Sequence, residues 1–241
     1  MIEKKIHYIW FGKNELPPLA KKCIESWKKY CPDYEIIEWN EDNFDVMSNI
    51  YTKEAYENKK WAFVSDYVRL YALYHVGGVY MDTDVEVIKN IDSFLENEAF
   101  SGFESYDKVP TGIMAAEKGN KHIKKMLEYY DDKHFVMENG ELDMTTNVTT
   151  ITNYFKEHNI KLNNTYQNCD GFVFYPSDYF CPKDPSTKKL NMTKNTATIH
   201  HFDGSWIPKG KKIKYKILNK MNKNFIRKCV LLKNKIKNIF K

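Results

Sequence analysis

The sequence lacks the features of membrane-spanning, zinc-finger and disulfide-rich proteins. No apolar run approaches the roughly 18–20 residues of a transmembrane helix, and the run Leu70–Met81 is interrupted by His75 and two glycines. The opening MIEKK leads into strand-like alternation and not into the apolar core of a signal peptide. The five cysteines form no CxxC pair, which favours reduced thiols. We therefore expect a cytoplasmic protein.

Carboxylates are absent from the end of the chain. Residues 209–241 contain 13 of the 37 Lys and Arg residues and no Asp or Glu, which leaves 24 basic and 32 acidic residues, a net charge of −8, in residues 1–208. Apolar residues recur in this tail three or four positions apart: Leu218, Met221, Phe225, Cys229, Leu232, Ile236 and Ile239. The pattern predicts a basic amphipathic helix. Such a helix would bind an anionic membrane surface, placing the protein peripherally on the inner face of the cell membrane, or would pack on the protein itself or on another copy. A lysine stripe without a recognised fold gives no reason to expect nucleic acid.

Aromatic residues are plentiful, and strand-like and helix-like segments alternate along the chain. Strands are expected at Lys5–Phe11, Tyr34–Trp39, Val79–Met81, Ala99–Glu104, Gly112–Ala116, Phe172–Tyr175 and Ala197–Phe202. Helices are expected at Leu19–Tyr30, Glu54–His75, Lys121–Tyr130 and Val148–His158. This alternation predicts an α/β fold whose mostly parallel sheet is covered by helices on both faces. No linker divides residues 1–208, so we expect one domain followed by the tail 209–241.

Two carboxylates follow the short hydrophobic strand that ends at Met81. Asp82 and Asp84 are two residues apart, and side chains at this spacing on an extended segment point to the same side. Open α/β sheets bind ligands at the carboxyl ends of their strands. Paired carboxylate oxygens suit Mg²⁺ or Mn²⁺ holding a diphosphate. A DxD by itself is weak evidence, because two acidic residues in a turn are common.

A second charged pair precedes the DxD on a predicted helix. Asp66 and Arg69 are three residues apart and so share one helix face. They form either a surface ion pair worth less than about 1 kcal/mol or part of a site, since the guanidinium of Arg69 suits oxyanions.

The run SDYVRLYALYHVGGVYMDTD, residues 65–84, resembles the signature of glycosyltransferase family 32, the DXD-containing sugar transferases that include bacterial capsule and lipopolysaccharide enzymes. It is also similar to the catalytic domain of the large clostridial glucosylating toxins. The opening strand around Trp10 and the segment Ile199–Trp206 resemble the two ends of the same domain. The resemblance implies a GT-A fold, a divalent metal (Mn²⁺ or Mg²⁺), and transfer of a sugar from a nucleotide donor with retention at the anomeric carbon.

The resemblance also implies roles for individual residues. The metal ligands would be Asp82, Asp84 and His201, with His200 in the core or behind the ligands, since adjacent strand residues face opposite sides. The catalytic residues would be Asp66, Arg69, Asp82 and Asp84. The donor would contact Ile9, Trp10, Phe11, Ser65, Asp66, Arg69, Tyr80, Asp82, Thr83, Ser205 and Trp206. Relatives often carry a Gly-Pro step in the acceptor region, where this chain has Thr146-Asn147-Val148. This difference leaves open the acceptor pocket and any carbonyl or amide near the sugar.

The resemblance further implies transfer of a hexose, most readily from a UDP-sugar of galactose, glucose or N-acetylglucosamine, to a glycan or lipid-linked saccharide in surface polysaccharide synthesis. Two alternatives stay open at this point. A haloacid-dehalogenase-like phosphohydrolase would use Asp82 as its nucleophile, but Glu86 stands where that motif has Thr or Val. The other is a catalytically silent module that binds sugar nucleotides. The residues offer no convincing nucleophile for a covalent intermediate. The resemblance implies front-side attack, in which the departing diphosphate accepts the acceptor's proton, as the route to retention.

Overall fold

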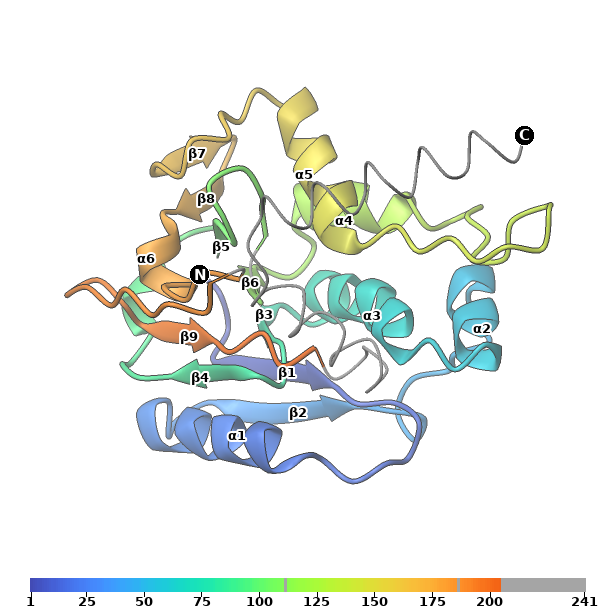
Figure 1. Cartoon of the computed structure of the whole chain (residues 1–241), viewed down its shortest axis with the longest axis horizontal. Helices are drawn as coiled ribbons and strands as arrows, with labels where there is room; N and C mark the ends of the chain where they lie inside the picture. Colours follow the sequence, from blue (N-terminus) through green and yellow to red (C-terminus); the bar gives the residue numbers. More distant parts are fainter. Residues whose placement is uncertain (111, 186, 205–241) are drawn as a thin grey trace, which may run out of the picture. The chain divides into compact units, whose positions relative to one another are not determined.

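A computed structural model describes residues 1–110, 112–185 and 187–204 of the chain (Figure 1). Its helices are α1 Pro18–Tyr30, α2 Ile50–Glu57, α3 Trp61–His75, α4 Lys121–Glu128, α5 Asn147–Glu157 and α6 Ser177–Phe180, with a 3-10 turn at Asp92–Phe94. Its strands are β1 Lys5–Ile9, β2 Glu35–Trp39, β3 Gly78–Met81, β4 Val85–Val87, β5 Ala99–Gly102, β6 Ile113–Ala116, β7 Gln167–Cys169, β8 Phe172–Tyr175 and β9 Thr198–His200.

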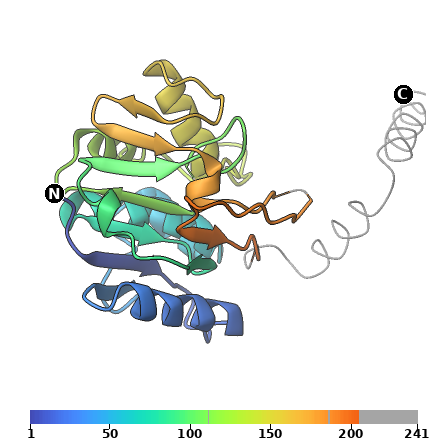
Figure 2. The ribbon, with the colours of Figure 1, turned by 90° about the vertical axis from the view of Figure 1, so that its left-hand side faces the viewer.

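Seven of these strands form one sheet in the order β2-β1-β3-β6-β5-β8-β7. Figure 2 shows them following one another from β1, near α1, to β8 and β7 at the opposite edge. Five strands run in one direction, namely β2, β1, β3, β5 and β8. β6 runs the other way between β3 and β5, and β7 runs the other way at the edge beside β8. A separate two-stranded sheet pairs β4 with β9. The predicted mixed, mostly parallel sheet is confirmed.

Side chains alternate between the two faces of the sheet and build a core on each. On β3, Val79 and Met81 belong to one core, together with Trp27 of α1, whereas Tyr80 belongs to the other, together with Val68 of α3. α2, α4 and α5 add buried residues to the α3 side, and α6 adds Phe180 to the α1 side. Helices therefore cover both faces, as predicted.

The structure differs from the sequence-based expectation at the long helix Glu54–His75, which is two helices. α2 ends at Glu57 and α3 begins at Trp61, and between them Lys59 has a φ of 55°, outside the α-helical region. The break has no Gly or Pro, so the uninterrupted apolar periodicity concealed it. Three short elements were also missed, namely β4, β7 and α6, because strands and helices of three or four residues carry almost no periodic signal.

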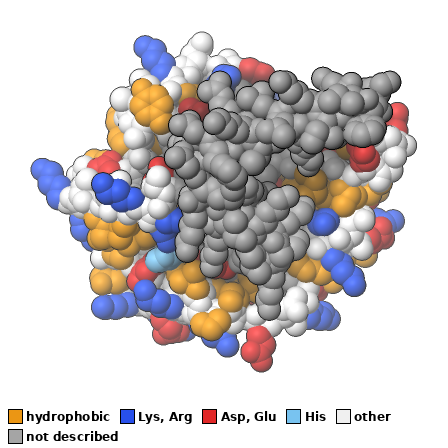
Figure 3. All heavy atoms as spheres, viewed as in Figure 1, with side chains coloured by type: hydrophobic (Ala, Val, Ile, Leu, Met, Phe, Trp, Pro, Cys, Tyr) orange, Lys and Arg blue, Asp and Glu red, His pale blue; other side chains and the backbone are white. Residues whose placement is uncertain are grey.

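Residues 1–185 and 189–203 form one compact unit. The predicted tail 209–241 lies outside the described residues, so its helix stays a prediction. No helix in the described part of the chain is long and apolar enough to cross a bilayer. In the view of Figure 3, Lys, Arg, Asp and Glu side chains of the described surface are interspersed with apolar ones, without a region of a single charge.

Candidate functional site

The carboxylates of Asp82 and Asp84 belong to a tight turn that joins β3 to β4. The backbone N–H of Val85 donates to the carbonyl of Asp82 at 3.0 Å, and that of Asp82 donates to the carbonyl of Gly112 at 2.8 Å. The prediction assumed an extended segment, but the turn also directs both carboxylates to one imidazole. His200 Nε2 lies 3.3 Å from Asp84 Oδ1 and 3.8 Å from Asp82 Oδ2.

A buried chain of charges connects Asp82 to α3. Arg69 Nη1 lies 3.4 Å from Asp82 Oδ1, and Arg69 Nη2 lies 3.2 Å from Asp66 Oδ1. The guanidinium also lies over the Tyr80 ring at 4.4 Å, and the Tyr80 hydroxyl donates to Asp82 Oδ1 at 2.5 Å. Asp66 and Arg69 are 6% and 9% exposed, so the surface ion pair considered from sequence is excluded. The helix face predicted from their spacing points into the protein, toward the DxD.

Burial and neighbouring charges set the protonation of Asp66, Arg69 and Tyr80. Burial raises the pKa of Asp66 to about 7, although Arg69 and the Asn147 N–H both lower it. Burial opposes the charge of Arg69, but Tyr80, Asp82 and Asp66 outweigh it and keep the pKa of Arg69 above its ordinary value. Burial also raises the pKa of Tyr80 well above its usual range, so this hydroxyl stays a donor. Arg69 is thus a permanent cation, and the charge of Asp66 changes near neutral pH.

His201, predicted as the third metal ligand, does not lie with the two aspartates in the structure, and His200 takes that place instead. β9 pairs antiparallel with β4, with His200 opposite Val85, and this register directs His200 toward the two aspartates. The His201 ring contacts Glu86 instead, with Nε2 2.8 Å from Oε2. As expected, only one of the two adjacent histidines faces the carboxylates, but this histidine is His200 and not His201.

Asp82, Asp84 and His200 form a group able to hold a metal ion, with one donor atom of each within 4.8 Å of the others. Burial works against ionisation of Asp84, but the His200 hydrogen bond and the Asp203 N–H, 2.7 Å from Oδ2, lower its pKa to about 2. Burial likewise opposes the charge of His200, but Asp84 and Asp82 raise the pKa of His200 well above its ordinary value. In the metal-free site the carboxylates thus favour a proton on His200, and Nε2 must release this proton to bind a metal ion.

Three further residues complete this site, and the motif did not reveal them. The amide Nδ2 of Asn147 is buried without a hydrogen-bond partner among the described residues, and the Asn147 backbone N–H donates to Asp66 Oδ2 at 3.3 Å. Gly112 leaves space: a Cβ there would lie 3.0 Å from Asp82 Oδ2. Glu104 interacts electrostatically with both aspartates, and burial raises its pKa. Of these three residues, the sequence analysis drew attention only to Asn147, which lies in the segment Thr146-Asn147-Val148 that stands in place of a Gly-Pro step.

The predicted donor residues of β1 separate into two groups. The side chains of Ile9 and Phe11 are buried in the core, so only their backbone is available to a donor. The half-buried Trp10 follows β1 at the same sheet edge as the DxD, because β1 and β3 are parallel neighbours. Its Nε1 donates to the carbonyl of Asn14 at 2.6 Å. It borders a hollow of ≈ 300 Å³ lined by Trp10, Lys13, Asn14, Glu38, Asn40, Glu41 and Asp42.

The other predicted donor residues are less informative. Ser65 and Thr83 are half-buried, and the Ser65 hydroxyl donates to the carbonyl of Trp61 at 3.1 Å. Ser205 and Trp206 lie outside the described residues.

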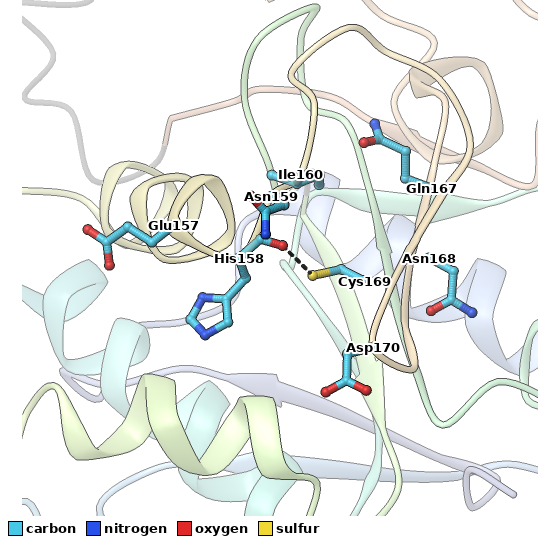
Figure 4. Close-up of a pocket in the computed structure, with 8 residues that line it drawn as sticks. All are labelled: Glu157, His158, Asn159, Ile160, Gln167, Asn168, Cys169 and Asp170. Atoms are coloured by element: carbon cyan, nitrogen blue, oxygen red, sulfur yellow. Dashed lines mark hydrogen bonds between the residues drawn. The ribbon is translucent and has the colours of Figure 1, made fainter.

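A larger hollow of ≈ 440 Å³ lies between the end of α5 and β7 (Figure 4). It is lined by Glu157, His158, Asn159, Ile160, Gln167, Asn168, Cys169 and Asp170, and the Cys169 thiol donates to the carbonyl of His158 at 3.2 Å. None of the predicted site residues borders it, so its size does not make it the functional site.

Residues 17–101 match a family described as the glycosyltransferase sugar-binding region containing a DXD motif. This part of the chain is therefore similar to the sugar-binding region of glycosyltransferases. Both Asp82–Asp84 and Asp66–Arg69 fall inside it, and the resemblance predicted from residues 65–84 is confirmed. The match gives no support to the phosphohydrolase alternative.

Known glycosyltransferases resemble the chain over larger stretches. It is 27% identical to inositol phosphoceramide mannosyltransferase 3 of Schizosaccharomyces pombe over 52% of this chain and 36% of that protein. An uncharacterised glycosyltransferase, L373, of Acanthamoeba polyphaga mimivirus is 24% identical over 86% and 85% of the two chains. The chain thus spans about a third of the first relative's length. The galactosyltransferase LgtC superposes on 93% of this chain and 99% of its own, with 14% identity and a TM-score of 0.46.

Proposed function

We propose that the chain is a metal-dependent glycosyltransferase that moves a hexose from a nucleotide-sugar to a saccharide acceptor. The observation that carries the proposal is the junction of two groups at the end of β3. One group is the cluster of Asp82, Asp84 and His200. The other is the buried pair of Asp66 and Arg69, and the guanidinium of this pair also contacts Asp82 of the first group. A transferase needs a place for a diphosphate and a place for a sugar next to each other, and these groups suit the two.

The cluster fits a divalent cation. Carboxylates suit Mg²⁺ and Mn²⁺, whereas imidazole favours transition metals, so the mixed set of donors fits Mn²⁺ better than Mg²⁺. Asp84 and Asp82 favour positive charge at His200, and a metal ion would supply this charge in place of the imidazole proton. A bound metal would neutralise the charge that develops on the leaving diphosphate.

The protein's own groups would orient the sugar. Ionised Asp66 accepts hydrogen bonds, and the unpaired Nδ2 of Asn147 beside it donates one, so together they can bind a sugar hydroxyl, which both donates and accepts. Arg69 holds Asp66 and Asp82 in fixed relation and supplies positive charge in a buried site, where charge acts more strongly than in water. Tyr80 keeps Asp82 Oδ1 occupied, which leaves Oδ2 directed toward His200.

The finer features of the reaction extend the proposal. We infer a retaining reaction by front-side attack, in which the departing diphosphate accepts the acceptor's proton, from the resemblance of residues 65–84. A UDP-sugar is the first donor to test, and the name of the S. pombe relative, a mannosyltransferase, adds nucleotide-linked mannose to the panel. That name also supports a lipid-linked acceptor. Surface polysaccharide synthesis is the role that this chemistry fits.

Membrane attachment through the tail belongs to the same proposal. It is supported by the basic, carboxylate-free sequence of residues 209–241. It would place a cytoplasmic enzyme at the inner face of the membrane, where a lipid-linked acceptor is found.

A screen of nucleotide-sugar hydrolysis tests the proposal without knowledge of the acceptor. UDP-sugars and nucleotide-linked mannose are incubated with the protein and Mn²⁺, and release of the nucleoside diphosphate is followed. At least one donor should be cleaved, chelation should stop the reaction and Mn²⁺ should restore it. Protection of the melting temperature by a donor that is never cleaved would favour the silent binding module.

A further inference from the structure

The segment His201–Asp203, here called the strap, crosses the turn that carries Asp84. The His201 backbone N–H donates to the carbonyl of Asp84 at 2.9 Å, and the Asp203 N–H donates to Asp84 Oδ2 at 2.7 Å. Lys183 Nζ donates to the carbonyl of His201 at 3.0 Å. The strap therefore fixes both the backbone and the carboxylate of one candidate metal ligand.

Phe202, in the middle of the strap, is strained. Its φ is 55°, a left-handed conformation that is unfavourable for a bulky residue and persists only where the surroundings enforce it. Its ring packs against the imidazole of His200, with centroids 4.1 Å apart and planes 31° apart. The strained residue thus fixes the orientation of a second candidate ligand.

The strap is also anchored by a contact between the side chains of His201 and Glu86. His201 Nε2 lies 2.8 Å from Glu86 Oε2, and both side chains are about one-fifth exposed. Glu86 belongs to β4 and also pairs with Lys22 of α1 at 3.0 Å, but the Lys22 side chain is 63% exposed. Of these two contacts of Glu86, the one with His201 is better protected from solvent. It holds the residue before Phe202, just as Asp84 holds the residue after it.

We propose that His201 and Glu86 are positioning residues that set the metal affinity of the site without binding the metal. Their contact keeps the strap in place, so that Phe202 orients His200 and the Asp203 N–H orients Asp84. The inference rests on the proposed function, because it takes Asp82, Asp84 and His200 as the metal site. Groups that orient metal ligands typically change metal affinity about 10–100-fold when they are removed.

The test is Mn²⁺ binding to the full chain, measured by calorimetry and by the electron paramagnetic resonance signal of free Mn²⁺, which requires no turnover. His201→Ala and Glu86→Ala should each weaken Mn²⁺ binding about 10-fold. Glu86→Gln keeps an oxygen acceptor for His201 and should stay close to wild type. Lys22→Ala removes the exposed ion pair of the same glutamate and serves as the matched control, with unchanged affinity.

Phe202→Gly provides a variant that does not depend on the anchor. Glycine adopts a positive φ without strain, so the fold should be retained, whereas loss of the ring frees His200 and should weaken Mn²⁺ binding. Wild-type Mn²⁺ affinity in folded His201→Ala, Glu86→Ala or Phe202→Gly protein would overturn the inference and leave the metal site intact. A wild-type protein that binds no Mn²⁺ would overturn the metal site and the inference together.

Discussion

Asp66→Asn should stabilise the protein at and above neutral pH while removing its activity. Burial raises the pKa of Asp66 from 3.8 to about 7, against the effect of Arg69. One pKa unit corresponds to about 1.4 kcal/mol, so ionisation of this carboxylate costs at most about 4 kcal/mol of folding free energy. Because the folded protein binds this proton more tightly than the unfolded chain does, the contribution of Asp66 to stability is highest below pH 3.8. It falls as the pH rises to about 7. Asparagine resembles the protonated acid and does not titrate.

Urea unfolding of wild type and Asp66→Asn, followed by circular dichroism between pH 4 and 8, measures this cost. The stability of Asp66→Asn relative to wild type should increase with pH through this window by about 2–4 kcal/mol and then level off. Asp131→Asn, at an exposed position of the same charge, is the control and should show no such trend. Parallel stability curves for wild type and Asp66→Asn would refute the reasoning. Donor hydrolysis should fall most in Asp66→Asn above about pH 7, where the wild type carries a carboxylate beside Arg69 that the amide cannot replace.

The remaining predictions concern the donor, the sugar and the tail. Trp10→Ala should weaken nucleotide binding by roughly 1–3 kcal/mol in calorimetry if the ring stacks on the base; lower stability with unchanged affinity would assign Trp10 to the core. Asn147→Ala should lower kcat/KM for donor hydrolysis about 3–10-fold without loss of stability, because the Asn147 amide is unpaired in the fold. Asn153→Ala, at an exposed position of α5, is the control and should leave both kcat/KM and stability unchanged. Removal of residues 212–241 should preserve hydrolysis and reduce flotation with anionic vesicles, more at low salt than at high salt; equal flotation would contradict the membrane proposal.

The proximity of the DxD to Asp66 and Arg69 of α3 could be predicted from the sequence, because the positions of both groups follow from local patterns. Helical spacing places Asp66 and Arg69 on one face, and the strand ending at Met81 places Asp82 at the sheet edge, so their meeting required only that α3 pack on β3. The identity of the metal histidine depends on long-range pairing instead. Which of His200 and His201 faces the aspartates is set by the register of β9 against β4, and a three-residue strand such as β4 leaves no pattern in the sequence. The contact of Asn147 with Asp66 spans 81 positions and likewise has no local signal.

The central claim, a metal-dependent transferase site at Asp82, Asp84 and His200, is tested most directly by turnover of a cleaved nucleotide-sugar in wild type and Asp84→Asn at saturating Mn²⁺. Asp84→Asn removes one oxygen donor and one charge from the metal group while keeping the size of the side chain. Asp84→Asn should fold but release no nucleoside diphosphate, and Asp82→Asn should be nearly as severe. Wild-type turnover in either variant would contradict a metal-dependent site at these residues.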